Sequence, residues 1–231
     1  MSVSENLLSV RKRIEEACAR AGRPADSVTL LAVSKTKPVS DIEELLSAGQ
    51  LDFGENYVQE LMEKADLLPE ARFHMIGHLQ RNKVSKTVGR AVMIHSVDSF
   101  RLAEEISKES VKRGIVTDIL LEVNGGNEES KFGYDFSEAA DAAEEISALP
   151  GIRLRGLMCV APFVDDPEKN RPIFRKMYQL AVDIRSKNAD NIDMNVLSMG
   201  MTGDFETAVE EGATIVRVGT AIFGERNYRR A

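Results

Sequence analysis

Apolar residues recur along the chain with a helical period in some segments and gather in short runs in others. After an N-terminal helical segment, apolar runs rich in β-branched residues are too short for helices and favour strands. The helical stripe consists of Leu7, Val10, Ile14 and Ala17, and the helix is expected to end at Gly22 and Pro24. The eight expected strands cover residues 29–35, 51–55, 72–77, 91–96, 117–124, 152–162, 193–200 and 214–224.

Helical patterns separate these strands. Residues 136–146 and 173–184 place apolar side chains on one helical face. Ser40 and Asp135 are expected N-caps, because a glutamate follows each of them three residues later. Strict alternation of strand and helix requires parallel strands joined by helical crossovers, covered on both faces.

Eight such units predict a fold of the α/β class, a (β/α)₈ TIM barrel formed by one domain over residues 1–231. The N-terminal helix is expected to cover the gap beside the weak last unit. A doubly wound open sheet is the alternative. Its glycine-rich fingerprint is missing from the turn after the first strand, which reads SKTKPVSD.

The composition excludes several classes of function. A formal net charge of -7 argues against a dedicated nucleic-acid binder, because neutralising phosphates needs clustered Lys and Arg. Cys18 and Cys159 cannot form a disulfide framework, and neither has a neighbour at metal-ligand spacing. No signal peptide is recognisable, and no apolar run approaches the roughly 20 residues of a membrane span. We expect a globular cytoplasmic protein without a metal.

Polar residues stand where the expected strands end, which is where a barrel carries its chemistry. A lysine at such a position is costly as a cation, since desolvation lowers its pKa, and the neutral amine can form a Schiff base with an aldehyde or ketone. Lys35 either serves this chemistry or points into solvent, whereas Lys37, before Pro38, is expected at the surface. The residues at strand ends are Lys35, Asn56, His78, Asn124, Ser198, Arg217, Gly219 and Thr220.

Glycine-containing turns follow the last two expected strands. They read MGMTGDFETAVEEG and GTAIFG, and their backbone amides suit a phosphate, which barrels commonly bind after strands seven and eight. Opposite a Schiff-base lysine, the two turns indicate a ligand with both an aldehyde and a phosphate. Pyridoxal 5′-phosphate (PLP) is a cofactor with both groups.

Arg217 interrupts an otherwise apolar strand, TIVRVG. A buried guanidinium must be paired, and the pyridine nitrogen of PLP is one acceptor, since PLP sites use Asp or Arg there. Because arginine stays protonated, it would donate to an unprotonated pyridine and make the ring a poorer electron sink than a carboxylate would. The alternative partner is a barrel carboxylate such as Glu122.

Five segments together resemble the pyridoxal phosphate homeostasis proteins, in order over about residues 5–228: LLAVSKTKP, FGENYVQE, HMIGHLQRNK, LSMGMTGD and VRVGTAIFG. The resemblance implies the fold type III barrel of alanine racemase, with Lys35 as the Schiff-base lysine, Arg217 at the pyridine nitrogen and Asn56 near the ring. Thr202 stands where the family more often has Ser. The phosphate cradle it implies comprises Ser198, the backbone around Gly200 and Met201, and Gly219 with Thr220.

The resemblance also bears on activity. The family is thought to bind and distribute PLP without established turnover, with apo-enzymes that need PLP as candidate transient partners. Alanine racemase uses a second acid/base, a tyrosine supplied with a further β-domain. The chain ends at Ala231 without room for that domain, so we expect a monomer with inefficient one-base proton transfer at Lys35. The tyrosines that do not match the racemase motif are Tyr57, Tyr134, Tyr178 and Tyr228.

Two enzyme classes remain as alternatives to a PLP-binding protein. One is an amino-acid racemase that uses Lys35 as base. The other is a barrel aldolase that forms its Schiff base with a sugar phosphate, although a sugar has no ring nitrogen for Arg217. Of the other residues with reactive side chains, Cys159 is expected to pack as a small hydrophobe. His74 and His95 are expected to be hydrogen-bonded residues of the core or barrel rather than ligands. The sequence assigns no role to His78, Lys37 and Lys131.

Overall fold

The computed structural model describes residues 2–126, 132–187 and 191–225. Eight parallel strands pair in chain order, and β1 pairs with β8, which closes the barrel. This closure confirms the predicted barrel and excludes the open sheet. The strands are β1 Thr29–Val33, β2 Asp52–Glu55, β3 Arg72–Met75, β4 Met93–Val97, β5 Thr117–Val123, β6 Ile152–Cys159, β7 Ile192–Ser198 and β8 Ile215–Val218.

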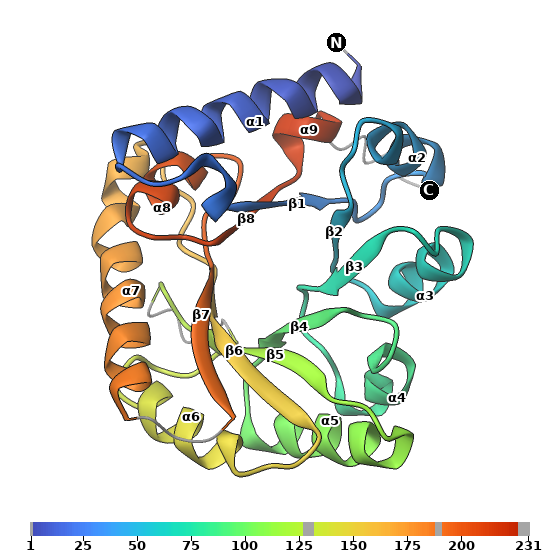
Figure 1. Ribbon diagram of the computed structural model, residues 1–231, viewed down its shortest axis with the longest axis vertical. Coiled ribbons are helices and arrows are strands. Elements are labelled where there is room, and N and C mark those ends of the chain that lie inside the picture. The colour runs from blue at the N-terminus through green and yellow to red at the C-terminus, as the bar shows by residue number, and fades with distance from the viewer. Residues whose placement is uncertain (1, 127–131, 188–190, 226–231) are drawn as a thin grey trace.

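Helices surround the barrel (Figure 1). Several of them present an apolar stripe to the strands, as α7 does with buried Phe174, Met177 and Ile184. None of the described helices is long and apolar enough to cross a membrane. The helices are α1 Val3–Arg20, α2 Val39–Ser47, α3 Val58–Leu67, α4 Val84–Thr87, α5 Phe100–Arg113, α6 Ala139–Ser147, α7 Arg171–Ser186, α8 Phe205–Glu210 and α9 Thr220–Phe223.

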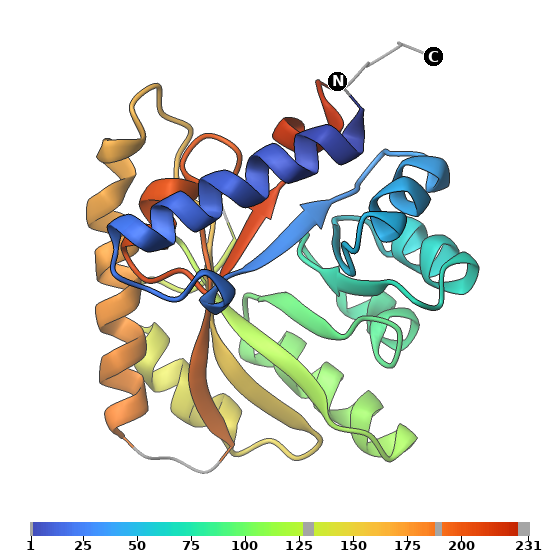
Figure 2. The same cartoon turned by 45° about the horizontal axis from the view of Figure 1, so that its top comes forward.

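Helix α1 lies outside the alternating units and packs across α8 and α9 (Figures 1 and 2). A capping box starts it, with Ser2 Oγ accepting from Glu5 N–H. Its C-terminal half is joined to α8 by an ion pair between Arg13 and Glu206 at 2.6 Å. The predicted stripe is buried, and α1 covers the short last unit as expected. The buried residues of α1 are Leu7, Val10, Ile14, Ala17 and Cys18.

Several predicted boundaries are wrong. The eighth strand ends at Val218 rather than at 224, and Gly219 and Thr220 begin the short helix α9. Strand β1 ends at Val33, so Lys35 lies in the following turn. Neither predicted N-cap is used, because α2 begins after Pro38 and α6 begins at Ala139.

The inside of the barrel is partly apolar and partly polar. Met93, Leu120 and Met158 form an apolar cluster separate from the large core between strands and helices. Because side chains alternate along a strand, the neighbours of Leu120 on β5 pack against the helices instead. His74, His95, Ser198 and Arg217 are buried polar residues from four of the strands. The barrel centre therefore contains hydrogen-bonding groups that must satisfy one another.

Candidate functional site

A cavity of about 490 Å³, named the upper cavity, lies at the carboxyl ends of the strands. Its volume falls in the range typical of small-molecule sites, roughly 300–1,000 Å³. Six of the predicted site residues line it: Lys35, Asn56, Met201, Arg217, Gly219 and Thr220. Ser198 and Gly200 are buried and do not line it. The cavity lies at the end of the barrel where enzymes of this architecture place their chemistry.

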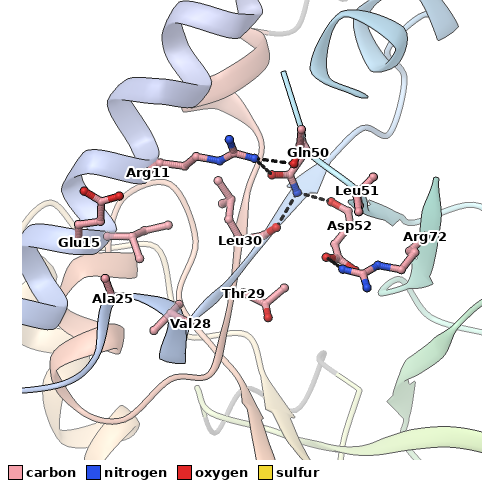
Figure 3. Close-up of a pocket in the computed structure, with 12 residues that line it drawn as sticks. Arg11, Glu15, Ala25, Val28, Thr29, Leu30, Gln50, Leu51, Asp52 and Arg72 are labelled. Carbon is pink, nitrogen blue, oxygen red and sulfur yellow. Dashed lines mark hydrogen bonds and ion pairs between the residues drawn. The ribbon is translucent and has the colours of Figure 1, made fainter. Parts of the chain in front are cut away.

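A second cavity, of about 300 Å³, lies at the amino ends of the strands (Figure 3). Three of its charged side chains bond to neighbouring groups: Arg11 donates to Gln50 Oε1 at 3.2 Å, and Arg72 forms an ion pair with Asp52. Because these charged groups are already paired, this lower cavity presents a weaker binding site than the upper one.

A buried ionic cluster holds the turn that carries Lys35. Lys64 on α3 is only 6% exposed, and its Nζ donates to Ser34 O, Glu55 Oε1 and Glu60 Oε2, each at 2.8 Å. Ser34 Oγ donates to the same Glu55 oxygen at 2.6 Å. Burial raises the pKa of Glu55, although the nearby Lys64 ammonium opposes this shift. The cluster ties the end of β1 to β2 and α3.

Thr36, directly after Lys35, has left-handed backbone with φ 62°. For a β-branched residue this conformation costs roughly 1–2 kcal/mol. It is held by hydrogen bonds from Thr36 N–H to Glu60 Oε2 at 2.7 Å and from Lys37 N–H to Ser34 O at 3.0 Å. The fold therefore fixes the backbone of this turn. Lys35 is half-buried at the cavity wall, which contradicts the interpretation that it only points into solvent.

Arg217 on β8 enters the cavity from below and is 5% exposed. Its Nη1 donates to Ser198 Oγ and its Nη2 to Cys159 O, both at 2.7 Å. Among the described residues it makes no ion pair within 4 Å, so the alternative salt bridge to Glu122 is not formed. Burial lowers its pKa, although guanidinium remains the charged form at neutral pH.

Asn56 follows β2 and offers the cavity an unused acceptor. Its Oδ1 is buried and has no hydrogen-bond partner among the described residues. The backbone of Asn56 is packed tightly against Gly77, where an added Cβ would lie 2.4 Å from Asn56 O. Glycine is therefore required at 77, and the contact holds Asn56 at the cavity wall.

The turns after β7 and β8 expose backbone donors to the cavity. Within the described part of the chain, the N–H groups of Thr202, Gly203, Gly219 and Thr220 have no hydrogen-bond partner, and all four residues line the cavity. The N–H of Met201, by contrast, donates to Asp204 Oδ1 at 2.7 Å. Gathered amides of this kind can bind an anion.

Polar residues also gather on the side of β4 and β5. The Glu122 carboxylate and the Tyr134 hydroxyl each have a buried oxygen without a partner among the described residues. Burial, reinforced by the nearby Asp98, raises the pKa of Glu122 to about 7 and that of Tyr134 to about 12. His78 is paired with Asp98 at 2.9 Å and stacks on Phe132.

Some residues of the site were not predicted. The loop after β6 contributes Pro162, Phe163 and Asn170, the end of β1 contributes Val33, and Ile76 follows β3. Apolar wall residues carry no chemical signal in a sequence, so only the position at a strand end could have indicated them. Cys159 is buried, and burial raises its pKa to about 12, which agrees with a packed hydrophobe. Lys131 and Tyr228 lie outside the described residues.

Comparison with known proteins first shows the family to which the chain belongs. Residues 6–227 match the alanine racemase N-terminal domain, so the chain belongs to that family. An alanine racemase from Corynebacterium glutamicum has the same fold, with a TM-score of 0.75 at 15% identity over 97% of this chain and 61% of the other.

Curated relatives narrow the family. Pyridoxal phosphate homeostasis proteins from Aquifex aeolicus and Homo sapiens are 44% and 40% identical, over 99% and 97% of this chain and 100% and 86% of theirs. The PipY structure from Synechococcus elongatus with PLP bound has a TM-score of 0.83 and 34% identity, covering 96% of this chain and 100% of that one. Within the larger family, the chain belongs to the pyridoxal phosphate homeostasis proteins.

Proposed function

We propose that this chain binds PLP reversibly in the upper cavity and thereby takes part in PLP homeostasis. The observation that carries the proposal is Arg217. This buried guanidinium faces the same cavity as Lys35 and contacts two neutral oxygens but no carboxylate among the described residues. A buried cation in such surroundings favours a ligand that adds an acceptor and negative charge. The ring nitrogen and phosphate of PLP supply both.

The lining residues fit the parts of this cofactor. Bound PLP supplies an aldehyde that condenses with the Lys35 amine, releasing one water, and hydrolysis reverses the reaction. Arg217 donates to the ring nitrogen, and the unpaired Oδ1 of Asn56 accepts from the hydroxyl group of the ring. The backbone N–H groups of Gly203 and Thr220, with their neighbours, bind the phosphate.

Several features support this assignment. The relatives named as homeostasis proteins match nearly the whole chain, and the PipY structure with PLP bound shares its fold. The orphaned Asn56 oxygen and the four cavity-facing amides are groups that a polar ligand would satisfy. Arginine at the ring nitrogen favours holding the cofactor over carbanion chemistry, since it leaves the pyridine unprotonated.

We further propose that the protein is a cytoplasmic monomer that passes PLP to apo-enzymes. Both cysteines are free and buried, which suits a reducing compartment. Sedimentation equilibrium with and without PLP tests the monomer, and the activation of a pure apo-enzyme by the loaded protein tests delivery.

The test of PLP binding uses Lys35→Ala beside Lys37→Ala. Lys37 is the matched control, because its Nζ donates to Phe223 O at 3.0 Å and it does not line the cavity. Each protein is loaded with PLP, its absorption spectrum is recorded, and the Schiff base is reduced with borohydride before peptide mass spectrometry. We expect a phosphopyridoxyl adduct on the Lys35 peptide in wild type and in Lys37→Ala, and none there in Lys35→Ala. No adduct on Lys35 in the wild type, or an adduct only with a sugar phosphate, would overturn the proposal.

A further inference from the structure

A chain of hydrogen bonds crosses the interior of the barrel from Arg217 to Asp52. Ser198 Oγ, which accepts from Arg217, lies 3.0 Å from His95 Nδ1. His95 Nε2 lies 2.9 Å from His74 Nδ1, and His74 Nε2 lies 3.2 Å from Asp52 Oδ1. Strands β8, β7, β4, β3 and β2 each contribute one member. This series of hydrogen bonds thus joins the upper cavity, which Arg217 lines, to the lower one, which Asp52 lines (Figure 3).

The donors and acceptors at the two ends determine which atom donates in each hydrogen bond of the series. Arg217 can only donate, so Ser198 Oγ accepts from it. At the other end, burial opposes ionisation of Asp52, but the hydrogen bonds from His74 and Arg72 and the charge of Arg72 outweigh it, so its pKa is lowered and the carboxylate accepts. His74 must therefore carry a proton on Nε2.

The two histidines between these ends have one arrangement that satisfies every group. With His74 uncharged, its Nδ1 accepts from His95 Nε2–H. His95 is fully buried, and burial, together with the charge of Arg217, lowers its pKa well below the usual value, so it carries one proton. Its bare Nδ1 then accepts from the Ser198 hydroxyl.

The opposite arrangement leaves a donor without an acceptor. If His74 carried a second proton on Nδ1, His95 would accept at Nε2 and donate from Nδ1, so that Ser198 Oγ accepted from both sides. The Ser198 hydroxyl proton would then need another partner. None of the described residues offers one, because Ser198 Oγ contacts only His95 and Arg217. An unsatisfied buried hydroxyl is costly.

We propose that Ser198, His95, His74 and Asp52 are positioning residues for Arg217. They send the single Ser198 proton away from the guanidinium, so that the Ser198 oxygen presents its lone pairs to Arg217 and holds it toward the upper cavity. This role rests on the proposed function, in which Arg217 donates to the ring nitrogen of PLP. The second anchor of Arg217, Cys159 O, is backbone and does not depend on the chain of side chains.

The first test uses the protein without cofactor, so it does not depend on PLP binding. Nitrogen NMR of ¹⁵N-histidine protein distinguishes protonated from bare ring nitrogens, and the exposed His78 provides an internal reference. We expect His95 to be protonated at Nε2 and bare at Nδ1, with a coupling through the hydrogen bond to His74 Nδ1. A proton on His95 Nδ1 would overturn the proposed direction.

The second test measures the affinity for PLP and its absorption band, which report on Arg217. His95→Leu removes the acceptor for Ser198, whereas His95→Gln can keep one donor and one acceptor, and Ser198→Ala removes the link to Arg217. Loss of roughly one net hydrogen bond predicts PLP binding weakened about threefold to tenfold in His95→Leu and Ser198→Ala, with a shifted absorption band. Their double variant should be no weaker than either single one, and His95→Gln should restore part of the loss.

The matched control is Phe73→Leu. Phe73 precedes His74 on β3 but packs against Phe53 in the core outside the barrel, so its loss costs stability without touching the hydrogen-bonded chain. We expect the folded Phe73→Leu protein to keep the wild-type spectrum and affinity. If folded His95→Leu and Ser198→Ala also kept both, the positioning role would be wrong. If the wild type itself took no PLP on Lys35, the proposed function would fail while the histidine NMR still decided the direction of the chain.

Discussion

Glu122 on β5 is the residue whose ionisation should be most visible in the stability of the cofactor-free protein. Its pKa is raised from 4.5 to about 7, first by burial and then by Asp98. The folded state therefore binds a proton that the unfolded state has released, and stability is full below about pH 4.5 and is lost as pH rises to about 7. At about 1.4 kcal/mol per pKa unit, the loss is roughly 3 kcal/mol.

Glu122→Gln should remove this loss, because the amide stays neutral. We expect the variant to be more stable than wild type at pH 8 and to show a flatter dependence between pH 4.5 and 7 in urea titrations. The exposed Glu70→Gln serves as the control and should follow the wild type. A wild-type and a Glu122→Gln profile that run parallel through this range would contradict the prediction.

The chemical residues of the site were easier to predict than its geometry. Lys35 and Arg217 could be inferred because a charged side chain in or beside a buried strand is costly unless it has a partner. Ser198 was placed by its position at a strand end, but the direction of its side chain depends on the barrel interior, where it bonds to Arg217 and His95. No local pattern in the sequence encodes that pairing across the barrel, because its partners are far away in the chain.

At the scale of elements, the buried cluster beneath the Lys35 turn predicts a large effect from one lysine. Lys64→Met would leave the Glu55 carboxylate buried without its cation, which typically costs about 3–5 kcal/mol. The loss should shrink at acid pH, where the raised pKa lets Glu55 take up a proton, and the added change Glu55→Gln should recover part of it.

Urea denaturation at pH 7.5 and 5 measures both effects. The control is Lys108→Met, since Lys108 forms an exposed pair with Glu104 at 2.9 Å with the same four-residue spacing as Lys64 and Glu60. Removing an exposed pair should cost under about 0.5 kcal/mol. Equal losses in the two variants would show that burial of the Lys64 pair is unimportant.

Helix α1 gives a second matched pair in consecutive leucines. Leu7 is fully buried beneath α1, whereas Leu8 is 62% exposed. Leu7→Ala should cost about 2–5 kcal/mol through lost burial and the cavity left behind, and Leu8→Ala within about 0.5 kcal/mol of zero. Chemical denaturation of the two variants side by side checks this. Similar stabilities would mean that α1 does not pack over α8 and α9 in solution.

The boundaries of the elements show where sequence patterns stop being informative. The run from 214 to 224 is apolar throughout, and a short apolar run cannot be assigned to strand or helix by its period. The chain turns at Gly219, which packs against Val33, and continues as α9. At Ser40 the capping pattern was overruled by Pro38, whose fixed φ suits the position before the first helical residue.

The whole barrel could be predicted because its signal is spread along the chain. Each unit repeats the same alternation of apolar run and amphipathic helix, so an error of several residues at one boundary leaves the count of eight unchanged. Closure itself depends on the pairing of β1 with β8, from opposite ends of the chain. The count and the barrel rule supplied this pairing, and no local pattern did.

The architecture of the whole site also limits the chemistry it can perform on an amino acid. Among the described residues that line the upper cavity, Lys35 and Asp204 are the only groups that could exchange a proton at neutral pH. Both Asp204 oxygens already accept hydrogen bonds, from Met201 N–H at 2.7 Å and from Asn170 at 2.8 Å. Racemisation needs an acid and a base on opposite sides of the reacting carbon, and this cavity provides one base.

We therefore expect the PLP-loaded protein to be an inefficient racemase. In deuterated water, L-alanine should lose its α-proton NMR signal far more slowly than the roughly 1–10³ s⁻¹ typical of enzymes, and chiral chromatography should find no D-alanine above a free-PLP control. Any slow exchange that does occur should vanish in Lys35→Ala, since Lys35 is the base. Formation of D-alanine at an enzymatic rate would require a second proton donor at the cavity, and Glu122, with its pKa raised to about 7, would then be the first residue to substitute.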